Sequence, residues 1–248
     1  MVVVPHDKLP PLSIGPHERV FILTGAGISA ESGIATFRDK NGIWQRYRIE
    51  DVASPEGWHA DASKVWLFYS QRREQAESVH PNPAHRALAA LEAKLENRLF
   101  LCTQNVDPLH ELAGSQRVFH MHGELFQSRC EDANCTTSPH EDHGIYLTRE
   151  SIPSCMACGG RMRPHICWFG ETPFGMDRIM RELARCDWFI TIGSSGAVYP
   201  AAGFVEEVRS HGRARTIYVG PERPENAGHF DECRLGKAGE AVPMLFSL

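Results

Sequence analysis

Short apolar runs recur along the chain, each closed by polar or glycine-containing residues, and they predict buried strands. They occupy residues 19–24, 98–103, 117–121, 188–192 and 215–219. Segments with a helical spacing of apolar residues lie between them, at 84–95, 176–184 and 201–210. Strands that are apolar almost throughout and alternate with helices are typical of a parallel sheet covered by helices on both faces. We therefore expect an α/β fold.

The segment 123–163 breaks this alternation. It contains clustered cysteines, several histidines and many polar residues, with little periodicity. We interpret it as a small module inserted into a larger domain formed by residues 17–122 and 164–248. The helical stretch around 39–80 is a candidate to pack with the small module.

The composition is that of an ordinary folded chain, because 42% of the 248 residues are hydrophobic and 23% are charged. Aspartate and glutamate total 31 against 26 lysines and arginines, and the resulting net charge of −5 gives no general attraction for nucleic acid or anionic lipid. No apolar run approaches the length of a membrane span, and residues 1–16 lack the pattern of a secretory signal. We therefore expect a cytoplasmic protein that binds neither nucleic acid nor membrane.

Residues 24–29 join the first strand to what we expect to be a helix beginning near Ile28. Gly25 and Gly27 allow the backbone to approach a pyrophosphate, and a helix N-terminus supplies free N–H groups. Ala30 stands where a dinucleotide-binding fingerprint has its third glycine, so a plain strand-to-helix turn is the alternative. A polar loop follows, instead of a second strand ending in an acidic residue, which argues against a hydride-transferring dehydrogenase.

Polar side chains also follow two of the other predicted strands. Gln104, Asn105 and Asp107 come after residues 98–103, and their amide and carboxylate groups suit ribose hydroxyls and a carboxamide. A polar turn is the alternative interpretation. His122 comes after residues 117–121, and an imidazole is the usual proton acceptor for a hydroxyl, although a lone histidine is more often structural. His120 has the parity to face the same side.

Four of the eight cysteines form two close pairs, Cys130 with Cys135 and Cys155 with Cys158. Two such pairs with a longer spacer are typical of a tetrahedral structural zinc site, in which the metal has no open position for catalysis. His140 and His143 lie in the spacer as alternative ligands. A disulfide framework is less suitable for a chain of this length without a secretory signal.

In combination, these motifs resemble those of the sirtuins, the NAD-dependent protein lysine deacylases. The likeness runs from about residue 19 to residue 243, and it is carried by residues 25–29, 32–38, 103–107, 122–123, 163–171, 193–195 and 236–239 together with the four cysteines. It implies a Rossmann-like NAD domain, a small zinc-ribbon domain and a cleft that admits an acyl-lysine substrate.

The resemblance further implies roles for individual residues. His122 is the general base that helps a ribose hydroxyl attack after the acyl oxygen has displaced nicotinamide, and the products are deacylated lysine, nicotinamide and O-acyl-ADP-ribose. The implied NAD-binding residues are Gly25, Ala26, Gly27, Ser29, Phe37, Arg38, Gln104, Asn105, Asp107, Gly193, Ser194, Ser195, Lys237 and Ala238. The implied substrate-binding residues are Tyr69, Arg72, Ile166, Trp168 and Phe169, and the implied zinc ligands are Cys130, Cys135, Cys155 and Cys158.

Tyr69 and Arg72 lie three residues apart in a helical stretch, so their side chains share a face. A guanidinium fork suits a carboxylate. By themselves they fit a core tyrosine and a solvated charge, but they also resemble the Tyr-x-x-Arg pair of the class III, desuccinylase-type sirtuins. We therefore expect a protein that removes succinyl or malonyl groups from acylated-lysine proteins. We also expect it to be a monomer. Deacetylation, protein ADP-ribosyl transfer and noncatalytic NAD sensing are the alternatives.

Overall fold

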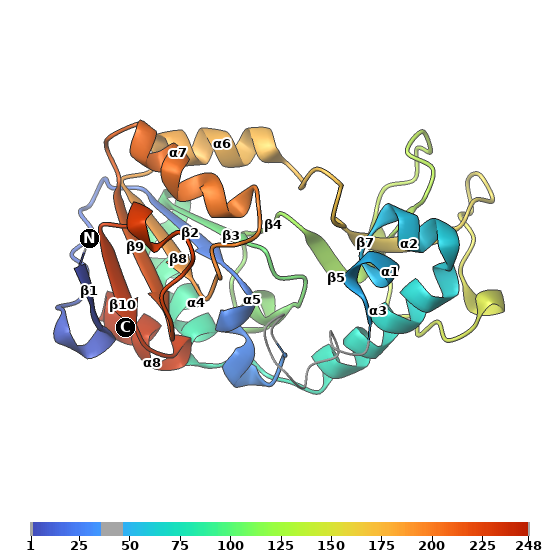
Figure 1. Ribbon diagram of the computed structural model, residues 1–248, viewed down its shortest axis with the longest axis horizontal. Coiled ribbons are helices and arrows are strands. Elements are labelled where there is room, and N and C mark those ends of the chain that lie inside the picture. Colours follow the sequence, from blue (N-terminus) through green and yellow to red (C-terminus); the bar gives the residue numbers. More distant parts are fainter. Residues whose placement is uncertain (1, 36–46, 248) are drawn as a thin grey trace.

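The structure, a computed structural model, describes residues 2–35 and 47–247. Seven parallel strands form one sheet in the order β1-β10-β9-β8-β2-β3-β4, and three antiparallel strands form a second sheet in the order β6-β5-β7 (Figure 1). The strands are β1 (Val2–Pro5), β2 (Val20–Thr24), β3 (Leu99–Thr103), β4 (Val118–His120), β5 (Gly123–Cys130), β6 (His140–Glu141), β7 (Met162–Ile166), β8 (Trp188–Ile192), β9 (Arg215–Gly220) and β10 (Glu232–Leu235). The α-helices are α1 (Ile49–Val52), α2 (Pro55–Ala60), α3 (Ala62–Glu77), α4 (Pro83–Leu95), α5 (Leu109–Leu112), α6 (Met176–Arg185), α7 (Phe204–Ser210) and α8 (Ala238–Phe246).

The predicted α/β fold is confirmed. All five predicted strands are present in the seven-stranded sheet, and the three predicted helical segments correspond to α4, α6 and α7. Helices α4 and α8 pack on one face of the sheet, while α6 and α7 cover the other (Figure 1). Strands β2, β3 and β8 are buried along their whole length because both faces are covered.

The direction in which the chain adds strands reverses at β2. From β2 it continues through β3 to β4 on one side, and it then returns to β8, β9 and β10 on the other. Ligands of doubly wound sheets bind outside the carboxyl ends of the strands at such a reversal. The strand reversal therefore predicts a ligand site at the loops after β2 and β8.

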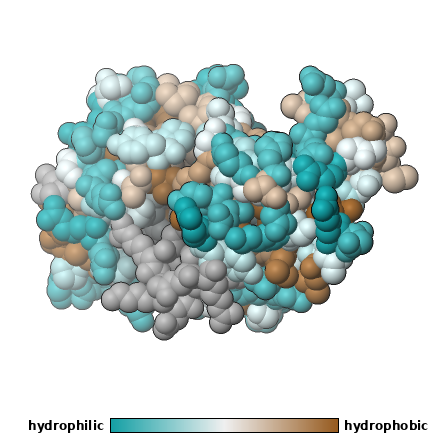
Figure 2. Space-filling view, turned by 45° about the vertical axis from the view of Figure 1, so that its right-hand side comes forward, coloured by the Kyte–Doolittle hydropathy of each residue, from teal (hydrophilic) through white to brown (hydrophobic). Residues whose placement is uncertain are grey.

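The second sheet packs with α1, α2 and α3 rather than with the larger sheet. Trp58, Trp66 and Phe68 from these helices form a buried cluster with Leu125 of β5 and with Trp168. In Figure 1 these elements lie together at the end opposite the two termini. Figure 2 shows that this side of the molecule is mostly hydrophilic, with hydrophobic residues in small separate patches.

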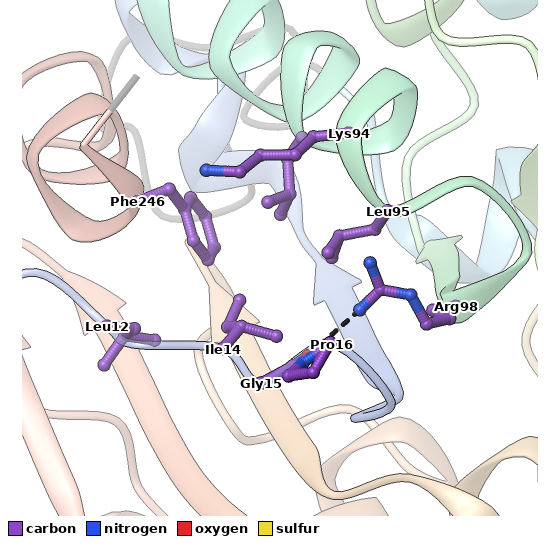
Figure 3. A pocket seen from close by; sticks show the side chains of 9 residues that line it. Leu12, Ile14, Gly15, Pro16, Lys94, Leu95, Arg98 and Phe246 are labelled. Carbon is purple, nitrogen blue, oxygen red and sulfur yellow. Dashed lines mark hydrogen bonds between the residues drawn. The ribbon is translucent and has the colours of Figure 1, made fainter.

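A small pocket of about 100 Å³ lies at the amino edge of the large sheet, away from the reversal (Figure 3). Leu12, Ile14 and Phe246 contribute apolar side chains, and Arg98 donates to the carbonyl of Gly15 at 3.1 Å. None of the predicted site residues lines it. Over the described ranges, no helix is long and apolar enough to cross a membrane.

Candidate functional site

The loops after β2 and β8 approach each other closely at the carboxyl edge of the sheet. The N–H of Gly25 donates to the carbonyl of Ile192 at 3.0 Å, and the N–H of Gly27 donates to that of Gly193 at 2.8 Å. A Cβ atom on Gly27 would lie 2.7 Å from the Gly193 carbonyl oxygen, and Gly193 itself has a φ of +65°. Both positions therefore require glycine for the backbones to pack at this distance.

The prediction of a helix beginning near Ile28 is wrong. Residues Ala26–Ile28 and Ala30–Ser32 form two separate 3₁₀ turns, and Gly33 ends the second with a φ of +97°. The side-chain amide of Asn82 donates to the Ile28 carbonyl at 2.7 Å and to the Ser32 hydroxyl at 3.0 Å, so a side chain uses the carbonyl that an α-helix would have bonded internally. The backbone N–H groups of this loop therefore belong to tight turns, not to a helix N-terminus.

Gln104 joins the loop after β3 to the loop after β8. Its Nε2 donates to Ser194 Oγ at 3.1 Å, and its backbone N–H donates to the Thr24 carbonyl at 2.9 Å. Ser195 is half-buried beside Ser194. Three loops that are distant in the sequence thus meet at one edge.

The remaining predicted cofactor residues lie in other segments. Lys237 is exposed and Ala238 is buried at the start of α8, and the preceding Gly236 N–H donates to the Gly220 carbonyl at 3.0 Å. This places both residues at the carboxyl edge next to the end of β9. Phe37 and Arg38 lie outside the described residues.

Ser29, Asn105 and Asp107 form a buried polar group beneath these loops. Ser29 Oγ donates to Asp107 Oδ2 at 3.1 Å and accepts from Asn105 Nδ2 at 3.2 Å. Burial raises the pKa of the Asp107 carboxyl, while the hydrogen bonds from Ser29 and from the Leu109 N–H act in the opposite direction. A carboxylate, an amide and a hydroxyl are therefore held at fixed positions in a site with little water.

His122 follows β4 and is half-buried, and burial lowers the pKa of its imidazole. Its Nδ1 lies 3.1 Å from the carbonyl of Gln104. A carbonyl can only accept, so Nδ1 carries the proton and Nε2 is left as the acceptor. His120 differs, because its Nδ1 bonds the Asn105 carbonyl and its Nε2 pairs with Glu111 at 2.8 Å.

The segment after β7 is held against His122. The Cys167 N–H donates to the His122 carbonyl at 2.8 Å, and the Phe169 N–H donates to the Ala53 carbonyl at 3.0 Å. Ile166 and Trp168 are buried, whereas Phe169 is 46% exposed. Three of the predicted substrate residues, Ile166, Trp168 and Phe169, therefore lie in one short segment that is bonded to the backbone of His122.

Tyr69 and Arg72 do lie together on α3. Tyr69 is buried, Trp168 Nε1 donates to its hydroxyl at 3.0 Å, and burial raises the pKa of that hydroxyl to about 12. Burial lowers the pKa of the Arg72 guanidinium, and the charges of Tyr69 and Asp107 act against this shift. Arg72 is half-buried, and its guanidinium lies close enough to Tyr69 and Asp107 for their charges to act on it.

The sulfur atoms of Cys130, Cys135, Cys155 and Cys158 all lie within 4.8 Å of one another. Two of the separations are 3.5 Å and 3.6 Å. Four thiolates on a tetrahedral zinc ion, each with a Zn–S distance of about 2.3 Å, would be separated by about 3.8 Å. The cluster fits zinc, and His140 and His143 are not part of it.

Several contacts of the site were not predicted from the sequence, although residues 163–171 carry part of the sirtuin likeness. His85 contacts Ser29, and Arg163 binds Glu171, whose carboxylate also accepts the Trp168 N–H at 2.8 Å. Arg73 is fully buried beside Arg72. A single histidine or arginine within an amphipathic helix has no distinguishing spacing, because only the tertiary fold decides what it contacts.

These features define a doubly wound nucleotide-binding protein with a four-cysteine metal module. Residues 25–200 match the model of the Sir2 family, and the chain belongs to that family. Proteins named NAD-dependent protein deacylase from Shewanella oneidensis and Vibrio cholerae are each 49% identical to it, over 92% and 93% of this chain and 93% and 92% of their own. Among solved structures, a mutant Sir2 homologue in complex with ADP-ribose has a TM-score of 0.83 at 40% identity and covers 93% of this chain and 91% of its own. A complex of a Sir2 homologue with NAD has a TM-score of 0.82 at 38% identity, covering 96% and 94%.

Proposed function

We propose that this chain is an NAD-dependent protein-lysine deacylase that prefers acidic acyl groups, succinyl and malonyl, over acetyl. The names of the relatives and the ADP-ribose and NAD complexes of the structural neighbours support the general activity. The observation that carries the acyl preference is the pair formed by the buried Tyr69 and the half-buried Arg72, whose hydroxyl and guanidinium share a face of α3 near Trp168. A desolvated guanidinium binds a carboxylate more strongly than a hydrated one.

In this proposal NAD supplies the electrophilic ribose carbon, and the chain's residues bind and orient the reactants. Gly25, Ala26 and Gly27 would hold the phosphates of NAD. Residues 193–195 would contact the adenosine phosphate or ribose, and Lys237 and Ala238 would contact the adenine. Asn105 and Asp107, oriented by Ser29, bind the ribose and the nicotinamide amide. His122 accepts a ribose hydroxyl proton at Nε2, because Nδ1 already donates to a carbonyl.

We also propose that residues 123–163 form the small zinc domain and that 17–122 and 164–248 form the NAD domain. The three-stranded sheet and the cysteine cluster support this division, with β7 crossing its upper boundary. Helices α1–α3 belong to the segment 17–122 but pack on that sheet, which supports the proposal that this helical stretch packs with the small domain.

The test measures nicotinamide release and peptide mass with NAD and one peptide that carries acetyl-, malonyl- or succinyl-lysine. Wild type, Arg72→Met and Arg72→Lys are compared, with Arg86→Met as a control at an exposed arginine of α4. We expect succinyl and malonyl turnover to fall at least tenfold in Arg72→Met while acetyl turnover is retained. Arg72→Lys should recover only part, because an ammonium lacks the planar fork.

Faster turnover of the acetyl peptide by wild type would disprove the acidic preference and leave the deacylase assignment intact. Nicotinamide release without a change in peptide acylation would favour ADP-ribosyl transfer or NAD hydrolysis. Binding of NAD without any nicotinamide release would favour the sensor.

A further inference from the structure

The Ser29 hydroxyl lies at the centre of a buried hydrogen-bonded group that includes a residue from outside the predicted site. Besides Asn105 and Asp107, its Oγ lies 3.4 Å from Nε2 of His85 on α4. Ser29 and His85 have no exposed surface, and Asn105 and Asp107 are 7% and 5% exposed. The four side chains are therefore almost completely shielded from solvent, and they supply one another's hydrogen bonds.

The N-terminal cap of α4 determines where the imidazole of His85 carries its proton. Asn82 begins the helix with its side chain accepting from the Ala84 N–H at 2.9 Å, and its own N–H donates to His85 Nδ1 at 3.3 Å. Burial lowers the pKa of His85 to about 4, so the ring is neutral at pH 7. A neutral ring that accepts at Nδ1 must donate from Nε2, and Ser29 Oγ is the acceptor.

This tautomer fixes the direction of the remaining bonds. A hydroxyl has one proton and two lone pairs. Ser29 accepts from His85 and from the amide of Asn105, so both lone pairs are used and its proton goes to Asp107. Asp107 also accepts from the Leu109 N–H at 3.2 Å, so each of its two oxygens accepts a hydrogen bond.

We propose that His85 is a positioning residue of the NAD site, which orients Ser29 so that Asp107 and Asn105 are held in their binding geometry. The inference rests on the proposed function, which assigns Asn105 and Asp107 to the ribose and the nicotinamide amide. His85 acts through Ser29 and touches no reactant. Loss of its donor would free the Ser29 hydroxyl to rotate away from Asp107.

Two substitutions of His85 separate this role from its part in the helix cap. The side-chain oxygen of Asn replaces Nδ1, so His85→Asn keeps the acceptor for the Asn82 N–H but has no donor near Ser29. The side-chain nitrogen of Gln replaces Nε2, so His85→Gln keeps that donor. Calorimetry with NAD and with ADP-ribose, thermal unfolding, and KM for NAD and for acyl peptide are measured for both variants and for wild type.

We expect His85→Asn to weaken NAD binding about tenfold and to raise KM for NAD by a similar factor, with KM for the acyl peptide unchanged. His85→Gln should bind NAD with an affinity within about threefold of that of wild type. This order of affinities should hold even if His85→Asn has a higher melting temperature than His85→Gln. In a Ser29→Ala background, replacing His85 by Asn should cause no further loss, because the group on which it acts is gone.

Equal NAD affinity in wild type and in a folded His85→Asn variant would overturn the proposal. So would equal losses in the Asn and Gln variants, or a full additional loss in the Ser29→Ala background, since each indicates a general packing effect. Failure of wild type itself to bind NAD is a different result, and it would overturn the proposed function together with this inference.

Discussion

At the scale of single residues, the proton on His122 Nδ1 and the free lone pair on Nε2 give this imidazole one chemical use, which is to accept a proton. We expect His122→Ala to lower kcat by a factor of about 10² to 10⁴, the usual contribution of a general base, while NAD binding is retained. Nicotinamide release and isothermal calorimetry on the same preparation provide the two readouts. Lost NAD binding would instead assign His122 to the cofactor site.

The lowered pKa of His122 also determines the acid limb of the rate profile. Burial disfavours the charged imidazole, so the neutral, active form persists to lower pH than for a histidine in water. In a plot of kcat/KM against pH, the fall on the acid side that reports His122 should therefore have its midpoint below about pH 6.5.

The sequence identified the residues at strand ends but not those that orient them. Gln104, Asn105 and His122 follow apolar strands, and parallel strands present their carboxyl ends at one edge. His85 and Arg163 reach the site across the fold, from a helix and from the small sheet. Their contacts depend on helix rotation and sheet packing, which a residue pattern does not specify.

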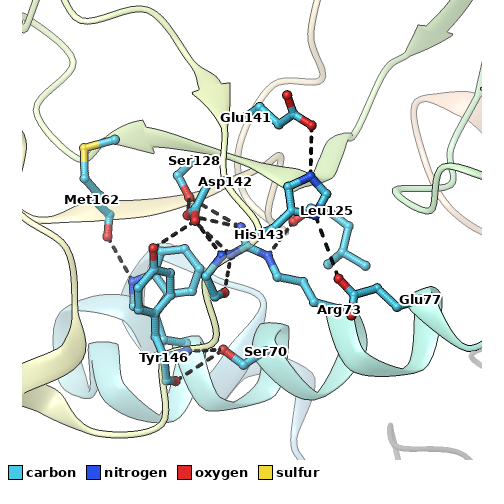
Figure 4. Close-up of polar contacts among 12 residues, drawn as sticks. Ser70, Arg73, Glu77, Leu125, Ser128, Glu141, Asp142, His143, Tyr146 and Met162 are labelled. Carbon is cyan, nitrogen blue, oxygen red and sulfur yellow. Dashed lines mark hydrogen bonds and ion pairs between the residues drawn. The ribbon is translucent and has the colours of Figure 1, made fainter.

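At the scale of elements, Arg73 of α3 joins the helix that carries Tyr69 and Arg72 to the three-stranded sheet. The guanidinium is fully buried, lies 3.3 Å from Asp142, and donates to the carbonyls of Leu125 and Gly144 at 2.9 and 2.6 Å (Figure 4). Asp142 also accepts from Ser128 and from the Tyr146 hydroxyl. Helix and sheet are thus held by one buried polar network.

We expect Arg73→Met to lower the free energy of unfolding by about 3–5 kcal/mol, because it leaves the Asp142 carboxylate, whose side chain is only 10% exposed, without its cation. Urea unfolding measures the change. The double variant Arg73→Met with Asp142→Asn should recover part of the loss, since no uncompensated charge remains. A double variant no more stable than Arg73→Met alone would show that the ion pair is not the cause.

Elements with uniform apolar patterns were predicted well, and those that depend on local polar contacts were not. Strands β2, β3 and β8 lie within a residue of their predicted bounds. Strand β10 was not predicted, because it carries Glu232 and the buried Arg234, which bond each other. Helix α8 was not predicted either and contains Pro243, which ordinarily ends a helix.

At the scale of the whole molecule, the cysteine cluster lies in the small sheet and the loops after β2, β3 and β8 lie at the edge of the large one, so we expect the two sheets to unfold separately. Removal of zinc with a chelator, or Cys155→Ser, should abolish hydrogen-exchange protection in β5 and β7 while protection in β2, β3 and β8 is retained. Cys233→Ser, at a buried cysteine outside the cluster, is the matched control and should keep one zinc per chain. Loss of protection throughout both sheets would show that they unfold as one unit.

Acid should destabilise the fold through its buried histidines. Burial lowers the pKa of His85 and of His165 to about 4 and that of His110 well below its usual value. The unfolded chain binds these protons near pH 6.5, so between about 6.5 and 4 unfolding takes up protons and stability falls as pH falls. His165→Gln should remove about one proton from this uptake, measured as the slope of unfolding free energy against pH, and an unchanged slope would contradict the assignment.

The small sheet enters and leaves the large domain at one place. Gly123 at the start of β5 pairs with Ile166 at the end of β7, and the Cys167 N–H is bonded to the His122 carbonyl. Displacement in a rotation grows with distance from the axis. A rotation of the small sheet about this junction would therefore move Cys130, at the far end of β5, much more than the backbone of His122, which adjoins Gly123.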